Sequence, residues 1–335
     1  MRILITKLSA LGDIVQAWGV LEYLKNRFPD AEIDWVVELS NKALVERHPL
    51  VSRAIAIDTK AIRKSLGFSR LGTAWNELRK EKYDYVFDLQ GNLKSALCVL
   101  ASRGKKKIGW QSSECAEFGA SFAYTQKIST QGIVSARERN LKLVQRAFDD
   151  DSNFVPKSHF LRLNPDEEQF VQSQVHEPFW MICPGSKWQN KVYPFEKLVE
   201  VLKSLKNHPN FLFVTGGGVE ARLVQDAFPN DRHLILPSLP ALQHIMSHAE
   251  LMIGMDSLPI HLADSVGTKT FALFGPSLSQ VYFPPNDNRA VFQGSCPYGK
   301  VFDRRCPILR TCPTGACIRD VSPETILESI NQSLN

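Results

Sequence analysis

The feature that most constrains this chain is a strand, loop and helix pattern that recurs along nearly its whole length. It begins with a β-rich segment at residues 2–6 and the loop KLSALGD, after which Ile14, Trp18 and Leu21 recur at helical spacing. Further apolar strand segments, each followed by helix or turn signals, lie at residues 33–38, 53–58, 83–91, 179–186, 211–218, 232–237, 250–256 and 269–276. Strands that alternate with helices in this way predict parallel sheets covered on both faces, and therefore a doubly wound α/β fold.

The pattern occurs in two similar halves. Since 335 residues exceed the size at which a single core stops growing, two domains are expected. The recurring apolar strand segments are interrupted between residues 149 and 177, where the chain is acidic and polar. This stretch is therefore the predicted linker. We expect an N-terminal domain over residues 1–160 and a C-terminal domain over 161–335, ending in a helix at 322–335 that Ser322 caps.

Composition narrows the class of protein. The 40 Lys and Arg outnumber the 35 Asp and Glu, and a net charge of +5 favours an anionic partner but is too small for a nucleic-acid-binding protein. No apolar run approaches the roughly 20 residues that span a bilayer, and the chain starts directly with a strand instead of a signal peptide. We therefore expect a cytoplasmic protein.

Two loops of the C-terminal half carry phosphate-binding features. The segment CPGSKWQNK follows the first strand of that half and places Lys187 and Lys191 to reach a phosphate, although two solvated lysines would look the same. In TGGGVE, three glycines where a strand meets a helix let backbone approach a ligand closely. The absence of GxGxxG makes a dinucleotide site a weak interpretation.

The segment MDSLPIHLADSVG is the most specific of these motifs. Asp256 ends a strand, Ser257 can cap the following helix, and His261 lies in the first turns of that helix. The N–H groups and dipole of a helix N-terminus would hold a diphosphate there. The alternative for His261 is a histidine packed in the core.

The N-terminal half is rich in basic clusters. Lys60, Arg63, Lys64 and Arg70 alternate with apolar residues, a pattern that suits the head group of an anionic amphiphile. A second basic stretch covers Arg103 and the lysines at 105–107, whereas RKEK at residues 79–82 is read as a solvated face.

The motifs KLSALGD, DLQGNLKSA, PGS with its following lysine, and DSxxxHLA together resemble the ADP-heptose:lipopolysaccharide heptosyltransferases of glycosyltransferase family 9. The similarity is greatest to members that add the first heptose. It implies a GT-B fold in which two Rossmann-like domains face a central cleft, the N-terminal one for the acceptor and the C-terminal one for ADP-heptose. It also implies an inverting transfer to Kdo of Kdo-lipid A that needs no metal or other cofactor. The enzyme would act as a monomer, without nucleic acid, at the cytoplasmic face of the inner membrane.

The resemblance also assigns roles to residues. Asp13 would be the general base, although its position also suits a helix cap. The donor-binding residues would be Ser186, Lys187, Lys191, Gly217, Glu220, Asp256, Ser257, Leu258 and His261. The acceptor-binding residues would be Ser9, Gly12, Lys60, Arg63, Lys64, Gln90 and Lys94. Lys191 would meet the diphosphate and Glu220 the ribose, while Leu258 stands where the family usually has glycine.

Several alternatives remain open from the sequence. The acceptor could be that of the second-heptose enzyme or another one, and a Rossmann-type dehydrogenase or a non-catalytic nucleotide-sugar sensor would share the tandem halves. Cys296, Cys306, Cys312 and Cys317 crowd one loop-rich segment without a CxxC pair, so reduced thiols are favoured there over a structural zinc or a disulfide.

Overall fold

The computed structural model describes residues 1–59, 61, 68–206 and 208–334. The chain forms two compact units, Met1–Arg162 and Leu163–Asn335, so the division falls just beyond the predicted boundary at residue 160. Among the described residues, no helix is both long and apolar enough to cross a membrane.

Unit 1 is built on a six-stranded sheet with the order β3-β2-β1-β4-β5-β6, and every neighbouring pair is parallel. Its strands are β1 (Arg2–Thr6), β2 (Glu32–Glu38), β3 (Arg53–Ile57), β4 (Lys82–Asp88), β5 (Arg103–Trp110) and β6 (Gln126–Ile128). Its α-helices are α1 (Leu11–Val15), α2 (Trp18–Arg27), α3 (Lys42–Glu46), α5 (Phe68–Arg79), α6 (Leu93–Ala101) and α7 (Ala136–Arg146). Short 3-10 helices occupy η1 (Leu39–Asn41), η2 (Ser112–Glu114) and η3 (Ala120–Ala123).

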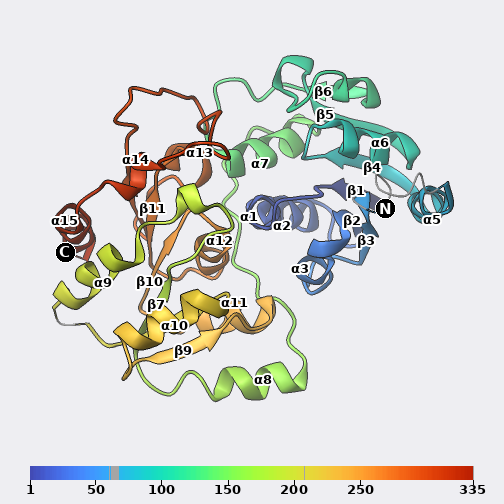
Figure 1. Ribbon diagram of the computed structural model, residues 1–335. Coiled ribbons are helices and arrows are strands. Elements are labelled where there is room, and N and C mark those ends of the chain that lie inside the picture. The colour runs from blue at the N-terminus through green and yellow to red at the C-terminus, as the bar shows by residue number, and fades with distance from the viewer. Residues whose placement is uncertain (60, 62–67, 207, 335) are drawn as a thin grey trace. The chain divides into compact units, whose positions relative to one another are not determined.

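Unit 2 contains a second six-stranded parallel sheet, with the order β12-β11-β10-β7-β8-β9. The strands are β7 (Phe179–Cys183), β8 (Asn210–Thr215), β9 (Arg232–Ile235), β10 (Leu251–Met255), β11 (Thr270–Phe274) and β12 (Arg289–Gln293). The helices are α8 (Pro165–Gln172), α9 (Phe195–Ser204), α10 (Gly218–Ala227), α11 (Leu239–Met246), α12 (Leu258–Asp264), α13 (Ser279–Tyr282), α14 (Ala316–Arg319) and α15 (Pro323–Leu334), with the 3-10 helix η4 (Gln189–Lys191) (Figure 1).

Both sheets have the same topology when strands are counted within each unit. The order reverses between β1 and β4 in unit 1 and between β7 and β10 in unit 2. Loops that leave the carboxyl ends of such a pair turn to opposite faces of the sheet, which opens a crevice where open α/β sheets bind ligands. These two edges are therefore the places to look for sites.

The strands have the burial expected of parallel sheets with helices on both faces. All five residues of β7, β10 and β11 are buried. Helices α9 and α15 close one face of the second sheet through Leu198, Ile326 and their neighbours. The predicted doubly wound fold, with one parallel sheet in each half, is confirmed.

Three strands were not predicted. In β5 (RGKKKIGW), the run that was interpreted only as a basic cluster forms a strand whose lysines reach outward. Lys105 Nζ pairs with Asp84 Oδ1 at 2.7 Å, and Lys106 lies over the Tyr85 ring, so β4 partners hold both cations. Strands β6 and β12 were also missed, since they are short or only half-buried and lack a strong apolar pattern.

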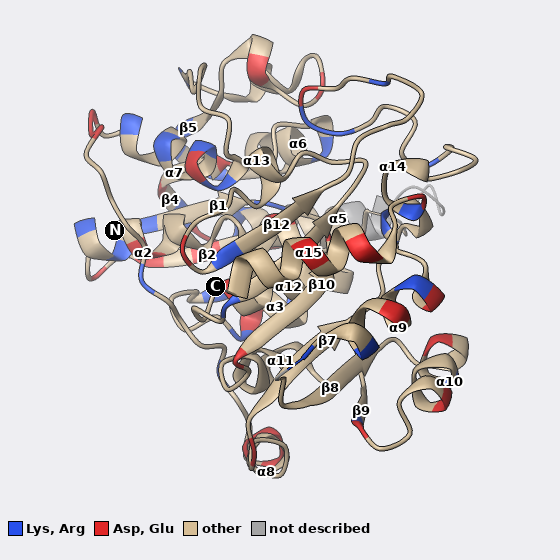
Figure 2. Ribbon diagram, turned by 90° about the vertical axis from the view of Figure 1, so that its left-hand side faces the viewer, with Lys and Arg blue, Asp and Glu red and all other residues tan. Residues whose placement is uncertain are grey.

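The predicted linker contains a helix. Asn164 begins α8 with a reciprocal cap, in which its side chain accepts from the Glu167 N–H and Glu167 accepts from the Asn164 N–H, each at 2.8 Å. Three acidic residues in its first turn, red in Figure 2, oppose the helix dipole. The polar composition was therefore that of an exposed, well-capped helix.

Candidate functional site

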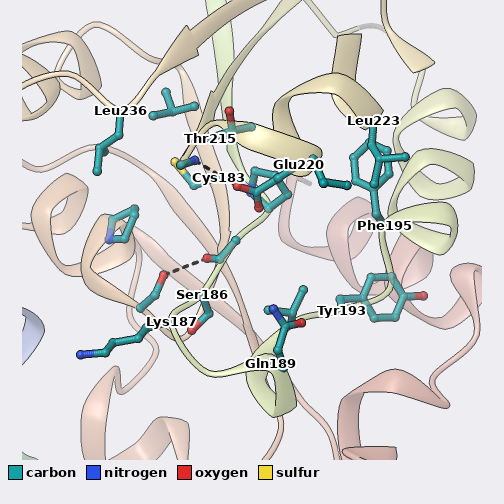
Figure 3. Close-up of a pocket in the computed structure, with 18 of the residues that line it drawn as sticks. Cys183, Ser186, Lys187, Gln189, Tyr193, Phe195, Thr215, Glu220, Leu223 and Leu236 are labelled. Atoms are coloured by element: carbon teal, nitrogen blue, oxygen red, sulfur yellow. Dashed lines mark hydrogen bonds between the residues drawn. The ribbon is translucent and has the colours of Figure 1, made fainter. Parts of the chain in front are cut away.

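Unit 2 has a pocket of about 700 Å³ at the carboxyl edge of its sheet. Its walls come from the loops that follow β7, β8, β9 and β10 and from the start of α9. This is the crevice that the strand order predicts. The lining includes five of the expected donor residues, namely Ser186, Lys187, Glu220, Ser257 and Leu258. Figure 3 labels the first three of them.

Glu220 is held by backbone inside this pocket. Its Oε2 accepts a hydrogen bond of 3.0 Å from the Gly216 N–H. Its Oε1 lies so near Gly185 that a Cβ on that glycine would be 2.4 Å away. Gly217, the N-cap of α10, has a φ of 88°, a conformation that favours glycine and turns the chain so that Glu220 falls in the first helical turn. The glycine-rich motif thus positions a carboxylate that can accept hydrogen bonds from ligand hydroxyl groups.

The rest of the lining combines apolar walls with a few polar groups. Phe195, Leu223 and Leu236 supply apolar surface, and in Figure 3 Phe195 and Leu223 lie on the opposite side of Glu220 from Leu236. The Lys187 side chain extends away from Gln189 and Tyr193, toward the other side of the view. Such a pocket can hold a ligand with a flat apolar group and a polar, anionic end.

Cys183 lines this pocket and is the last residue of β7. Burial raises the pKa of its thiol far above the ordinary value, with a smaller contribution from Glu220. Cys183 is therefore a neutral thiol that forms part of the pocket wall and does not act as a nucleophile.

Lys191 and Asp256 form an ion pair next to the pocket, outside its lining. The Lys191 ammonium at the end of η4 contacts Asp256 Oδ2, and the Ser277 hydroxyl donates to the same oxygen. Both side chains are largely buried, with exposed fractions of 16% for Lys191 and 6% for Asp256. The structure thus brings together two predicted donor residues and adds Ser277, which sequence reasoning missed.

The helix that follows Asp256 differs from expectation in its cap. Ser257 occupies the N-cap position of α12, but its hydroxyl donates to the Gly185 and Met255 carbonyls at 3.4 and 3.3 Å instead of accepting a helix N–H. Ser257 is thus the N-cap residue, as expected, but its hydroxyl links the β7 and β10 loops and does not form the side-chain cap. Leu258 lines the pocket directly after it.

His261 lies in the interior of α12, with an exposed fraction of 3%. Its ring packs edge-on against Phe283 with centroids 5.6 Å apart. The residue is not part of the pocket lining, so its placement fits the alternative of a packed core histidine.

At the carboxyl edge of the first sheet, the loops after β1 and β4 lie together. Gln90 Oε1 accepts from the Leu8 and Ser9 N–H groups at 3.2 and 3.3 Å, and Lys7 Nζ donates to the Leu89 carbonyl at 2.8 Å. The half-buried Asp13 lies in α1, and its Oδ2 accepts from the Ala10 N–H at 3.0 Å. Asp13 thus does stabilise the start of a helix, with its carboxylate at the same edge as Ser9, Gly12 and Gln90.

Asp88 organises this edge and was not singled out from the sequence. Its Oδ1 accepts from the Gln90 and Gly91 N–H groups at 2.8 and 3.0 Å, and its Oδ2 accepts from the Tyr124 hydroxyl at 2.8 Å. Complete burial raises the pKa of Asp88, and these hydrogen bonds oppose that rise. The sequence feature that could have identified Asp88 is an acidic residue at the end of an apolar strand, three residues before the turn glycine Gly91.

The remaining acceptor-side residues are only partly placed. Lys94 lies in the first turn of α6, where its Nζ donates to Thr59 Oγ1 at 3.4 Å. Lys60, Arg63 and Lys64 lie outside the described residues.

The four cysteines near the C-terminus are free thiols, as are Cys98, Cys115 and Cys183. Within the described parts of the chain, no three His, Cys, Asp or Glu side chains are arranged to hold a metal ion. Cys312 stands apart chemically, because N–H groups of Gly315 and Thr314 lower its pKa.

Comparison with known proteins gives the family. Residues 72–310 match the model of glycosyltransferase family 9 (heptosyltransferase). The lipopolysaccharide heptosyltransferase 1 of Campylobacter coli is 28% identical over 314 residues, which cover 88% of this chain and 90% of that protein. The enzyme of the same name from Pseudomonas aeruginosa is 26% identical, with 83% and 79% covered.

Solved structures agree on the fold. E. coli heptosyltransferase WaaC with ADP has a TM-score of 0.80 at 19% identity, covering 99% of this chain and all of that one. E. coli ADP-heptose lps heptosyltransferase II has a TM-score of 0.70, also at 19% identity, covering 100% of this chain and 98% of that one. The GT-B fold class is confirmed, and the chain belongs to glycosyltransferase family 9, the heptosyltransferase family.

Proposed function

We propose that this protein transfers L-glycero-D-manno-heptose from ADP-heptose to Kdo of Kdo-lipid A, in assembly of the lipopolysaccharide inner core. The observation that carries the proposal is the pocket at the carboxyl edge of the second sheet, in a chain of a heptosyltransferase family. The names of its relatives, which are heptosyltransferases 1 in Campylobacter, Pseudomonas and E. coli, favour the first heptose.

The pocket has the chemistry that a nucleotide sugar requires. Its apolar walls at Phe195, Leu223 and Leu236 suit an adenine ring, and the Glu220 carboxylate can accept hydrogen bonds from ribose hydroxyls. Lys187 lies in the lining and Lys191 lies next to it, so both are candidates to neutralise a diphosphate. In this proposal Asp256 holds Lys191 in place when the donor is absent.

The transfer itself is a single displacement with inversion. Asp13 Oδ1 accepts the proton of the acceptor hydroxyl while that oxygen bonds to the anomeric carbon. The bond from this carbon to the diphosphate breaks with its electron pair, and ADP leaves. Because Asp13 Oδ2 is held by the Ala10 N–H, the carboxylate is already oriented when the acceptor binds. Lysine ammonium groups stabilise the charge that develops on the departing ADP.

The direct test incubates purified protein with ADP-heptose and Kdo-lipid A and follows the product by mass spectrometry. One heptose added to Kdo-lipid A supports the proposal. Product only with an acceptor that already carries one heptose would reassign the protein to the second position. Failure to transfer heptose to any acceptor, with ADP-heptose still bound, would favour a nucleotide-sugar sensor.

Three further parts of the proposal have simple measurements. The reaction needs no metal, so turnover should persist in EDTA, and loss that Mg²⁺ restores would contradict this. The active form is a monomer, which sedimentation at assay concentration checks. The protein acts as a peripheral protein at the cytoplasmic face of the inner membrane, which fractionation of cells checks.

A further inference from the structure

Helix α6 is apolar on its exposed side as well as on its buried side. Leu93, Leu97 and Leu100 follow each other at helical spacing, and their exposed fractions are 50%, 66% and 51%. The opposite face is buried and consists of Ser95, Ala96, Cys98, Val99 and Ala101, four of which belong to the core. A surface helix normally turns its leucines inward, so the outer stripe needs another explanation.

The loop before β6 adds aromatic residues to the same patch. Phe118 and Phe122 are 94% and 79% exposed. The loop is fastened to the start of α6, because the Ala116 N–H donates to the Gly91 carbonyl at 2.8 Å and Glu117 Oε2 accepts from the Leu93 N–H at 2.9 Å.

The apolar side chains of the helix and loop form one surface. A Cβ built on Gly119 would lie 3.7 Å from Leu93 Cδ2 and 3.9 Å from Phe122 Cδ2, so these side chains converge around that glycine. We call the surface of Leu93, Leu97, Leu100, Phe118 and Phe122 the α6 face. Exposed apolar side chains that are grouped on one helix and the loop fastened to it mark an interaction site.

Cations surround the α6 face. Lys107 Nζ donates to the Leu100 carbonyl at 3.0 Å, Lys127 Nζ lies 6.0 Å from the centre of the Phe122 ring, and Lys94 lies in the first turn of the helix. Between residues 93 and 127 there are six Lys and Arg but only two Glu, and of the six, Lys105 and Lys106 are held by Asp84 and Tyr85 of β4.

We infer that the α6 face docks on an anionic lipid bilayer, with its leucines and phenylalanines among the acyl chains and its lysines at the head groups. Apolar residues that lie between basic ones are the pattern of proteins that bind in the plane of a membrane interface. A protein partner would account for the apolar stripe but gives no reason for the excess of cations. The inference rests on the proposed function for its purpose, since a lipid-linked acceptor is presented at such a surface.

The test measures binding to vesicles of phosphatidylcholine, with and without phosphatidylglycerol, for three forms of the full chain. The first is the parent. The second carries Leu97→Ser, Phe118→Ser and Phe122→Ser. The third is a matched control in which exposed valines elsewhere are changed, Val134→Ser, Val155→Ser and Val301→Ser.

We expect the parent and the control to bind the anionic vesicles, with binding that salt weakens. The α6-face variant should bind at least tenfold more weakly. Equal binding of all three forms would overturn the inference. Loss of a parent dimer in the α6-face variant, with no vesicle binding by the parent, would show instead that the face joins two copies of this chain.

A charge variant separates the two components of the surface. Lys107→Gln with Lys127→Gln should weaken binding to anionic vesicles severalfold and reduce its salt dependence, whereas Lys157→Gln with Lys300→Gln should not. Equal effects of both pairs would show that net charge alone, and not this face, attracts the bilayer.

Activity distinguishes failure of this inference from failure of the proposed function. With a water-soluble Kdo acceptor, turnover of the α6-face variant should match the parent, while turnover on vesicle-embedded Kdo-lipid A should fall. Vesicle binding that depends on the α6 face, without heptosyl transfer by any form, would retain the docking surface and refute the function.

Discussion

The substitution Gly185→Ala tests the close approach of the Gly185 backbone to Glu220 in the pocket of unit 2. The Gly185 backbone does not lie in the positive-φ region, so alanine fits the chain there. Its Cβ, however, would lie 2.4 Å from Glu220 Oε1 and 3.2 Å from the other carboxylate oxygen. Since the obstructing atoms end a flexible side chain, Glu220 should move and the fold should survive.

The expected loss of donor affinity follows from the hydrogen bonds that Glu220 would lose. When the carboxylate moves, its hydrogen bond from the Gly216 N–H is strained or lost, and so is any hydrogen bond to a ribose hydroxyl. Each such bond contributes about 1 kcal/mol at a half-exposed site. We therefore expect donor affinity to fall by about five- to thirtyfold, which corresponds to about 1 to 2 kcal/mol, with an unfolding free energy lowered by about 1 kcal/mol.

The assay is a double-mutant cycle on ADP-heptose binding by calorimetry. The variants are Gly185→Ala, Glu220→Ala and their combination, with urea unfolding of each as the stability control. If the clash acts through Glu220, the combined variant should bind no more weakly than Glu220→Ala alone. Parent affinity in Gly185→Ala, or fully additive losses, would refute the view that the glycine makes room for this carboxylate.

Four other changes test separate features. Asp13→Asn should lower turnover at least about 100-fold while ADP-heptose affinity stays within about twofold. The reason is that the amide keeps an acceptor for the Ala10 N–H but cannot take a proton. Near-normal turnover would show that Asp13 is not the general base. Burial lowers the pKa of His48 to about 3, so the unfolded chain binds the extra proton first as pH falls below about 6.5. Urea unfolding should therefore show stability lost by up to about 1.4 kcal/mol per pH unit between pH 6 and 4, and His48→Gln should flatten that slope. Tyr124→Phe should lower the unfolding free energy by about 1 to 3 kcal/mol, since it removes the hydroxyl donor from the buried Asp88; an unchanged urea midpoint would contradict this. Alkylation of the native protein, mapped by mass spectrometry, should modify Cys312 before the buried Cys98 and Cys183, and first modification of either buried thiol would show that the interior opens.

The fold was predictable from sequence where burial is complete. In a parallel strand with both faces covered, nearly every residue is apolar, so β7 (FWMIC) and β10 (LMIGM) are conspicuous. β5 was missed because it contains lysines where an apolar pattern was expected. Lys105 and Lys106 interact with Asp84 and Tyr85 of β4, so the strand forms without burying these side chains. Period-two patterns cannot identify a strand whose long side chains lie along a neighbouring strand.

The sequence predicted which loops form the candidate site, but not which of their side chains contact one another. Glycine, serine and lysine after a strand indicate a crevice, and Ser186, Lys187 and Glu220 do line one. The sequence contains no signal that Lys191 and Asp256, which are far apart along the chain, meet as an ion pair, or that Ser277 joins them. Such contacts depend on the order of strands in the sheet, which periodicity does not encode.

The repeated strand order has a consequence for how this protein can change over generations. In each sheet, the crevice arises from connections that turn to opposite faces, and not from any particular side chain in the loops. The buried residues that stabilise unit 2 lie mostly in its strands and in the helices that cover them, whereas the pocket-lining residues Ser186, Lys187, Gln189 and Gly216 lie in loops or in the short 3-10 helix η4 and are not fully buried. Substitution of these four residues can therefore alter which ligand is selected with less effect on stability than substitution of the buried Tyr193 in the loop after β7. The architecture keeps recognition free to diversify while the core stays under constraint.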